Sequence, residues 1–179
     1  MVGKAFFSCT GWTYDRSPEL WSDKQVVIGF PHTSNMDAVR AFALFMALGL
    51  KTYTLIKREL FVWPLSMILR MVGGLPADRA NSGQIVTKMA EEFRQRERFT
   101  LVLAPEGTRS KDGRKPPIRT GFWHIAKAAN VPIVLMLADN TSRRGRFLGR
   151  IQPTTLKDDL LQIQALYRSA GIEVVIPAD

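Results

Sequence analysis

Only one cysteine, Cys9, occurs among the 179 residues of the chain. A single cysteine excludes an intramolecular disulfide and any metal site built from several cysteines, and it is typical of a protein from a reducing compartment. We therefore expect a cytoplasmic protein.

Long hydrophobic runs are also missing. No stretch reaches the roughly 18 uninterrupted apolar residues that a membrane-spanning helix needs, and the best candidate, 41–50, lies between Arg40 and Lys51. The segment 1–14 contains aromatic side chains but no continuous apolar run of signal-peptide length. We therefore expect neither a transmembrane helix nor a secretion signal.

Acidic residues are few, with 16 Asp and Glu against 25 Lys and Arg, so the formal net charge is +9. This excess predicts attraction to polyanions, which include nucleic acid, anionic lipid headgroups and phosphorylated substrates. A well-solvated surface is the alternative interpretation. The apolar fraction of 46% is ordinary for a globular protein. We expect a single domain over 1–179, with an N-terminal segment 1–24 as a candidate membrane contact and a catalytic core at 25–179.

Short apolar runs rich in β-branched residues alternate with helical periodicity from about residue 25 onward. We expect strands at 25–30, 52–56, 75–77, 99–103 and 132–137, and helices at 36–49, 64–72, 81–96, 120–130 and 156–169. The helix at 36–49 is apolar almost all round, which predicts deep burial. The basic segment 143–150 fits a loop or an edge hairpin. This alternation predicts an α/β fold with a mostly parallel sheet and helices on both faces, and active sites at the carboxyl ends of its strands.

The first candidate site follows the strand at 25–30 and contains His32 and Asp37. Residues five apart in a continuous helix point about 140° away from each other, so His32 must precede the helix if the two side chains meet. With Ser34 as N-cap, Asp37 falls in the first turn, where its carboxylate could orient the His32 ring. Such a pair is a catalytic dyad, in which the second ring nitrogen accepts a proton from an alcohol.

A structural interpretation of the same residues stays open. Ser34-x-x-Asp37 before an apolar run is also a capping-box pattern, in which Asp37 only satisfies backbone donors and the helix dipole. The other histidine, His124, lies inside the helix expected at 120–130, and we expect it to be structural.

The second candidate site follows the strand at 99–103. Gly107 permits a tight turn with exposed N–H groups, and Thr108 offers a hydroxyl. Arg109 could bind a phosphate with two parallel hydrogen bonds. A polar turn with an exposed Glu106–Arg109 pair is the alternative. The basic residues that follow within 111–119 favour the phosphate site.

A strongly apolar segment with basic ends lies between these two sites. Its apolar residues fall within 60–72, with Lys57 and Arg58 before them and Arg79 after them. Such a segment can rest in a membrane interface or line an acyl-chain groove, and it can also simply belong to the core.

These residues together resemble the glycerophosphate and lysophosphatidic acid acyltransferase family, whose four sequence blocks occur here in order between about residue 31 and residue 136. The blocks are His32-x4-Asp37; Lys57-x-Glu59-Leu60 with Pro64, Gly74 and Arg79; Pro105-Glu106-Gly107-Thr108-Arg109; and Val131-Pro132-Ile133-Val134. Each motif is short, and their order makes the resemblance specific.

The resemblance implies transfer of a fatty acyl group from acyl-CoA or acyl carrier protein to a hydroxyl of a glycerol phosphate or lysophospholipid, with lysophosphatidic acid as the expected acceptor. It implies His32 as general base and Asp37 as its orienting carboxylate. The residues implied for the acceptor phosphate are Arg79, Glu106, Gly107, Thr108 and Arg109. It implies no metal and no tightly bound cofactor, and we expect a peripheral protein on the cytoplasmic face of an anionic membrane.

Two alternatives come from other classes of protein. A thioester hydrolase would use the same dyad to activate water. A basic nucleic-acid-binding module would use the charge excess, but no aromatic-rich strand pair or recognition-helix pattern accompanies it, so we expect no nucleic-acid partner. The sequence contains no Walker A, G-x-S-x-G, G-x-G-x-x-G or H-E-x-x-H pattern. This excludes the common enzyme classes that these motifs identify.

Overall fold

The computed structural model of the chain describes residues 2–30, 35–78, 81–105 and 117–177. Seven strands form one sheet in the order β1-β7-β6-β2-β5-β3-β4. The strands are β1 (Thr13–Tyr14), β2 (Lys24–Phe30), β3 (Thr52–Lys57), β4 (Gly74–Ala77), β5 (Phe99–Leu103), β6 (Ile133–Asp139) and β7 (Arg144–Ile151). The helices are α1 (Val2–Thr10), α2 (Asn35–Leu48), α3 (Leu65–Met71), α4 (Ser82–Gln95), α5 (Gly121–Ala129) and α6 (Leu156–Ser169), with 3-10 turns η1 (Pro18–Leu20) and η2 (Arg58–Leu60).

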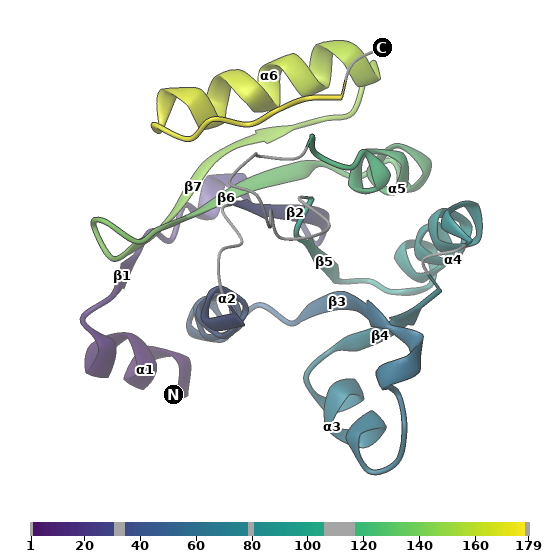
Figure 1. Ribbon diagram of the computed structural model, residues 1–179, viewed down its shortest axis with the longest axis horizontal. Helices are drawn as coiled ribbons and strands as arrows, with labels where there is room; N and C mark the ends of the chain where they lie inside the picture. The colour runs from purple at the N-terminus through teal and green to yellow at the C-terminus, as the bar shows by residue number, and fades with distance from the viewer. Residues whose placement is uncertain (1, 31–34, 79–80, 106–116, 178–179) are drawn as a thin grey trace.

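The sheet separates two hydrophobic cores, as expected when helices cover both faces. One core joins the sheet to α4, α5 and α6, and its largest fully buried side chains include Phe93, Ile125 and Tyr167. The other core joins the sheet to α1 and α2 through Phe7 and Phe45. In Figure 1 these two groups of helices lie on opposite sides of the sheet, and α3 lies beside β4 at the end of the molecule away from α6.

The carboxyl ends of four parallel strands lie level with one another. One row of paired residues crosses these strands through Val27, Val102, Thr54 and Gly74. Three residues further along each strand, the chain reaches Phe30, Pro105, Lys57 and Ala77. Parallel strands share direction, so these positions define one edge of the sheet, where ligand sites of α/β folds gather.

The expected α/β architecture is confirmed. All five expected strands and all five expected helices are present, with ends that differ by a few residues at most. The segment expected as a loop or an edge hairpin is a hairpin, because β7 pairs antiparallel with β6. Two elements were not expected, α1 and β1, the latter pairing with β7 outside it in the sheet.

The expected deep burial of α2 is wrong for one side of this helix. Leu44 and Phe45 are buried against the sheet, but Val39, Phe42 and Met46 are 45%, 38% and 41% exposed. These three positions are spaced by three and four residues, so they form one stripe along the helix. The all-round apolar pattern therefore marks an exposed apolar stripe as well as a core face.

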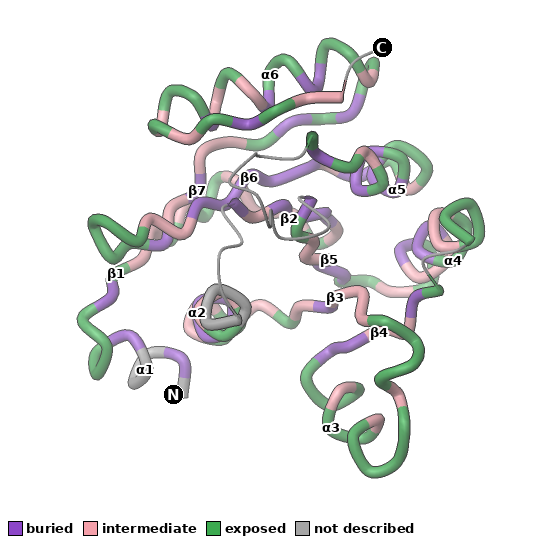
Figure 2. Tube along the Cα trace, in the orientation of Figure 1, coloured by how far each residue is buried: buried purple, intermediate pink, exposed green. Residues whose placement is uncertain are grey.

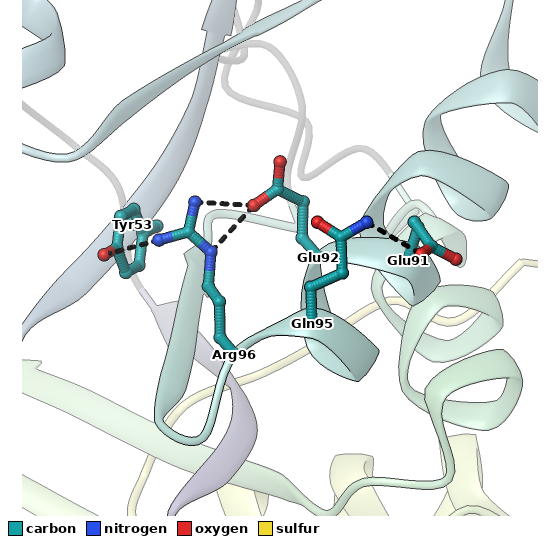
Figure 3. Close-up of polar contacts among 5 residues, drawn as sticks. All are labelled: Tyr53, Glu91, Glu92, Gln95 and Arg96. Atoms are coloured by element: carbon teal, nitrogen blue, oxygen red, sulfur yellow. Dashed lines mark hydrogen bonds and ion pairs between the residues drawn. The ribbon is translucent and has the colours of Figure 1, made fainter.

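Arg96, which follows α4, ties that helix to the sheet. Its guanidinium donates from Nε to Glu92 Oε2 over 2.7 Å and from Nη1 to the Tyr53 hydroxyl over 2.8 Å. The guanidinium carbon also lies 4.6 Å from the centre of the Tyr53 ring. Figure 3 shows the cation between the carboxylate of α4 and the phenol of β3, beside a separate Gln95–Glu91 contact. This clamp fixes the end of α4 opposite to the functional edge.

Asp159 joins α5 to the start of α6 from a buried position. Only 2% of this residue is exposed. Its carboxylate accepts hydrogen bonds from Trp123 Nε1 over 2.6 Å, from the Thr154 backbone N–H over 2.7 Å and from the Thr154 hydroxyl over 2.8 Å. A buried carboxylate needs such donors, since an unpaired one would be very costly.

Asp159→Asn should lower the free energy of unfolding by about 2 kcal/mol, because the amide replaces an ionised acceptor and turns a donor toward other donors. Chemical denaturation monitored by circular dichroism measures this change. Asp158→Asn is the matched control, since the Asp158 side chain accepts only an exposed bond from the Thr155 hydroxyl. Equal losses in the two variants would contradict a special role for the buried carboxylate.

Candidate active site

The residues predicted for catalysis and phosphate binding belong to segments that begin or end at the edge with level strand ends. The segment 31–34 follows β2, 79–80 follows Asp78 after β4, and 106–116 follows Pro105 after β5. The residues that lie outside the described parts of the chain are His32, Arg79, Glu106, Gly107, Thr108 and Arg109. Asp37 lies in the first turn of α2, as expected, while its side chain is not among those described. Their roles stay predictions, and what the structure gives is the frame around them.

The two ends of the 106–116 segment are held together by the backbone. Arg119 N–H donates to the Pro105 carbonyl over 2.8 Å, and Ile118 N–H donates to the Val175 carbonyl over 2.9 Å. Pro105 and Ile118 are both buried. The described residues on either side of 106–116 are therefore held beside the carboxyl end of β5.

The end of β2, two residues before His32, packs against α6. Phe30 is buried and its ring contacts that of Tyr167 edge to face, with centres 4.7 Å apart. The Tyr167 hydroxyl lies 3.1 Å from the Ile28 carbonyl and 3.0 Å from the Met136 carbonyl. These contacts fix the end of β2, after which the chain continues to the predicted dyad. A catalytic side chain needs rigid supporting residues of this kind.

A turn stabilised by the Asp139 carboxylate follows β6 at the same edge. Asp139 accepts hydrogen bonds from the Ser142 hydroxyl over 2.6 Å and from the backbone N–H groups of Thr141 and Ser142 over 2.9 Å and 3.1 Å. These bonds to Ser142 hold the pKa of Asp139 below its usual value. Next to it, Asn140 accepts a bond from Arg40 of α2 over 3.2 Å, which links the turn to the helix that carries Asp37.

An apolar cavity of about 150 Å³ lies between α2 and the sheet. Its walls come from the carboxyl halves of β2, β5 and β6, from the start of β3, and from Ala41, Phe42 and Phe45 of α2. Phe30 and Ala104 are among its lining residues. They lie at the ends of the two strands that precede the segments 31–34 and 106–116, so the cavity adjoins these strand ends.

Gly29 sets the width of this cavity on the side of β2. A Cβ atom on Gly29 would lie 2.9 Å from Met136 Cε, so even the smallest side chain would displace the methionine. No sequence motif predicts this cavity, because its lining residues are scattered over five elements.

The apolar segment expected either as core or as a membrane or groove element is exposed. Of the 13 large hydrophobic residues that the structure describes as exposed, eight lie within 60–72 and three form the α2 stripe. Trp63 is 86% exposed, Met71 79% and Met67 64%. Figure 2 shows α3 and its flanking turns mostly in green, the colour of exposed residues. The core interpretation is therefore wrong, and of this segment only Phe61, Arg70 and Val72 line a described cavity.

In the described part of the chain, no helix has both the length and the apolar character to cross a bilayer.

The helix expected at 120–130 is α5. Its residue His124 is exposed, and the His124 ring contacts the ring of the neighbouring Trp123.

Comparison with known proteins shows the family to which this chain belongs. The model of a family described as Acyltransferase matches residues 13–137. A 1-acyl-sn-glycerol-3-phosphate acyltransferase from Limnanthes douglasii is 33% identical over 132 residues, which are 70% of this chain and 46% of that protein. The protein of the same name from Escherichia coli (strain K12) is 31% identical over 117 residues, 63% of this chain and 46% of its own length.

The fold is also found in a solved structure. The crystal structure of the 1-acyl-sn-glycerophosphate (LPA) acyltransferase PlsC from Thermotoga maritima matches with a TM-score of 0.62 at 16% identity, over 95% of this chain and 74% of that one. At this identity the likeness concerns the fold alone. The two proteins therefore share the same fold.

The chain belongs to the acyltransferase family, because the family model matches well over half of it. This confirms the resemblance drawn from the four ordered blocks. The chain spans less than half the length of the first curated relatives that it matches.

Proposed function

We propose that this chain transfers a fatty acyl group from a thioester to a hydroxyl of a phosphate-bearing glycerol, with lysophosphatidic acid as the first acceptor to test. The observation that carries the proposal is the level register of β2 and β5. It brings the ends of the two strands that precede the His32 and Glu106–Arg109 segments to one edge, next to an apolar cavity. The donor is acyl-CoA or acyl carrier protein, and no metal or bound cofactor takes part.

In this proposal His32 acts as general base and Asp37 orients its ring. One ring nitrogen takes the proton of the acceptor hydroxyl while the oxygen attacks the thioester carbonyl carbon. The tetrahedral intermediate then collapses, the carbon–sulfur bond breaks, and the leaving thiolate receives the proton from the imidazolium. The Asp37 carboxylate stabilises that cation, and its place in the first turn of α2 also suits a helix cap, so the two interpretations are compatible.

The proposed acceptor-phosphate site consists of Arg79 and of residues 106–109. Arg109 would bind the phosphate bidentately, Gly107 and Thr108 would donate to it, and Glu106 would position the arginine. Support comes from the backbone hydrogen bond between Arg119 and Pro105, which holds the chain on either side of 106–116 beside the end of β5.

His32→Ala should reduce acyl transfer by at least about 100-fold, because the substrate hydroxyl loses its proton acceptor. Thiol release from an acyl-CoA donor measures the rate, and thermal unfolding checks that the variant is folded. His124→Ala is the matched control, since this exposed residue of α5 is the other histidine of the chain. Retained turnover in a folded His32→Ala protein would overturn the assignment.

The acyl chain is proposed to occupy the apolar cavity between α2 and the sheet. Methylene groups gain about 0.8 kcal/mol each on leaving water, so an apolar cavity of limited length favours chains that fill it. The cavity adjoins Phe30, which precedes the segment with His32, so a chain inside it would bring its carbonyl end toward the predicted base.

Gly29→Leu should lower the rate with long acyl chains more than with short ones, because the new side chain enters the cavity. Transfer rates measured over a series of acyl-CoA chain lengths give this ratio. The control is Gly83→Leu, since a Cβ at Gly83 of α4 meets no atom within 4 Å. An unchanged chain-length profile in Gly29→Leu would contradict this use of the cavity.

The exposed apolar residues of 60–72 and of the α2 stripe are proposed to dock on an anionic membrane at the cytoplasmic face. Phe42 and Val72 belong to this surface and also line the cavity, so the surface leads directly into the proposed acyl site. Amphipathic surfaces of this kind bind in the headgroup region, helped by basic residues, and the chain carries a net charge of +9.

Replacing Trp63, Met67 and Met71 together by serine should weaken binding to vesicles that contain anionic lipid by about tenfold or more, because three exposed apolar side chains lose their lipid contacts. Vesicle co-sedimentation measures the partition. Leu161→Ser with Val175→Ser is the control, since these residues are similarly apolar and exposed elsewhere, at 47% and 37%. Equal partitioning of both variants would refute this surface.

A further inference from the structure

A second cavity lies at the β4 end of the sheet. Its volume is about 470 Å³, within the range of cavities that hold whole small molecules. Its walls come from η2, α3, the end of β4 and the first turns of α4. A single phosphate group would fill only a small part of this space.

Three cationic side chains line this cavity, namely those of Arg58, Arg70 and Lys88. Among the residues that the structure describes, none of the three forms an ion pair with a carboxylate. Glu92, one turn after Lys88 on α4, pairs with Arg96 instead. Cations that line one cavity without counter-ions attract an anion into it.

The four sequence blocks do not account for these cations. Arg58 occupies the unspecified position of Lys57-x-Glu59-Leu60, and Arg70 and Lys88 lie outside every block. The basic cavity is therefore a feature of this chain that the family motifs do not specify.

The cavity begins beside a residue proposed for the acceptor phosphate. Asp78 lines the cavity, and Arg79 is the next residue in the chain. Consecutive Cα atoms lie about 3.8 Å apart, so a phosphate bound by Arg79 would lie close to the cavity. In the proposed function Arg79 and Arg109 already bind that phosphate. The three further cations therefore suit a second anionic group of the same ligand.

Amide side chains complete the polar wall. Asn81 and Gln84 line the cavity at the start of α4. Asn81 donates from Nδ2 to Asp78, the single carboxylate among the described lining residues, over 3.4 Å. Carboxamides both donate to hydroxyl groups and accept from them. The wall therefore suits a ligand that carries hydroxyl groups as well as negative charge.

The position of α3 indicates that this ligand is a lipid headgroup. The helix contributes Arg70 to the cavity, and its exposed residues Met67 and Met71 belong to the surface proposed to dock on a membrane. Phe61, near the start of 60–72, also lines the cavity, and its ring centre lies 5.7 Å from the Arg70 guanidinium carbon. A lipid that enters from the membrane would therefore reach this cavity with its headgroup.

We propose that this cavity is a headgroup subsite for the acceptor, and that it selects a lysophospholipid whose polyol headgroup carries a second anionic group. The inference rests on the proposed acyl transfer, because the ligand is the acceptor of that reaction. The first phosphate would lie at Arg79. The second anionic group would lie between the three cations, and the hydroxyls of the polyol beside the two amides. Lysophosphatidic acid has no headgroup beyond its phosphate, so it would be the poorer acceptor.

Three acceptors with the same acyl chain separate these features. Lysophosphatidic acid has no further headgroup, lysophosphatidylglycerol adds a polyol, and lysophosphatidylglycerol phosphate adds a second anionic group to that polyol. With the whole chain and an acyl-CoA donor, kcat/KM should rise along this series, and the last acceptor should be about tenfold better than lysophosphatidic acid. Equal values for lysophosphatidylglycerol and its phosphate, or the highest value for lysophosphatidic acid, would overturn the inference.

The double variant Arg70→Gln with Lys88→Gln removes two of the cations and keeps most of both side-chain stems. It should lower kcat/KM for lysophosphatidylglycerol phosphate about tenfold more than for lysophosphatidic acid, mainly through KM. The control, Lys51→Gln with Arg168→Gln, removes the same charge from exposed positions outside the cavity and should keep the wild-type ratio. An equal loss with both acceptors would assign the cations to the phosphate that the acceptors share, which would contradict a separate subsite.

A binding measurement tests the subsite without turnover. In titration calorimetry the wild type should bind the deacylated headgroup glycerophosphoglycerol phosphate about tenfold more tightly than glycerophosphoglycerol, and the double variant should lose this preference. A wild type without the preference would overturn the inference. The preference without acyl transfer to any of the three acceptors would refute the proposed function and leave the anion subsite in place.

Discussion

The parallel register of β2, β5, β3 and β4 is the constraint on which the rest of this structure depends. It makes four strand ends level, so that segments far apart in the sequence leave the sheet at one edge. The packing beneath that edge keeps it in place. Tyr167 of α6 contacts Phe30 and lies within hydrogen-bond distance of carbonyls of β2 and β6, and Arg119 donates to Pro105 across the segment 106–116. The chemistry proposed for the segments at this edge therefore depends on hydrogen bonds several residues away from it.

Two surfaces of opposite character flank this edge. On one side, the apolar cavity opens between α2 and the sheet and is continuous with exposed apolar residues of α2 and of 60–72. On the other, Arg58, Arg70 and Lys88 line a larger cavity at the β4 end.

The sequence predicts the fold well where periodicity is strong. Buried strands such as β2 and β5 and amphipathic helices such as α4 occur as expected, since each pattern buries one face or both. The strand β1 escapes prediction because a two-residue strand has no period, and α1 was not expected either. The exposure of α2 escapes it because an apolar pattern does not say which side stays uncovered. Ordered motifs predict the family, which the comparisons confirm, and the edge where their segments lie follows from parallel pairing. Neither cavity could be predicted, since Gly29 and Phe42, or Arg58 and Lys88, come together only through tertiary packing.

The most direct test of the account is the fate of the acyl group. The purified chain is incubated with an acyl-CoA donor, with and without lysophosphatidic acid, and the lipid products are measured by mass spectrometry. The account predicts the diacyl product, phosphatidic acid, in amounts equal to the free thiol released, and little thiol release without the acceptor. Free fatty acid released at the same rate with and without the acceptor would contradict it, because the chain would then activate water and not a substrate hydroxyl.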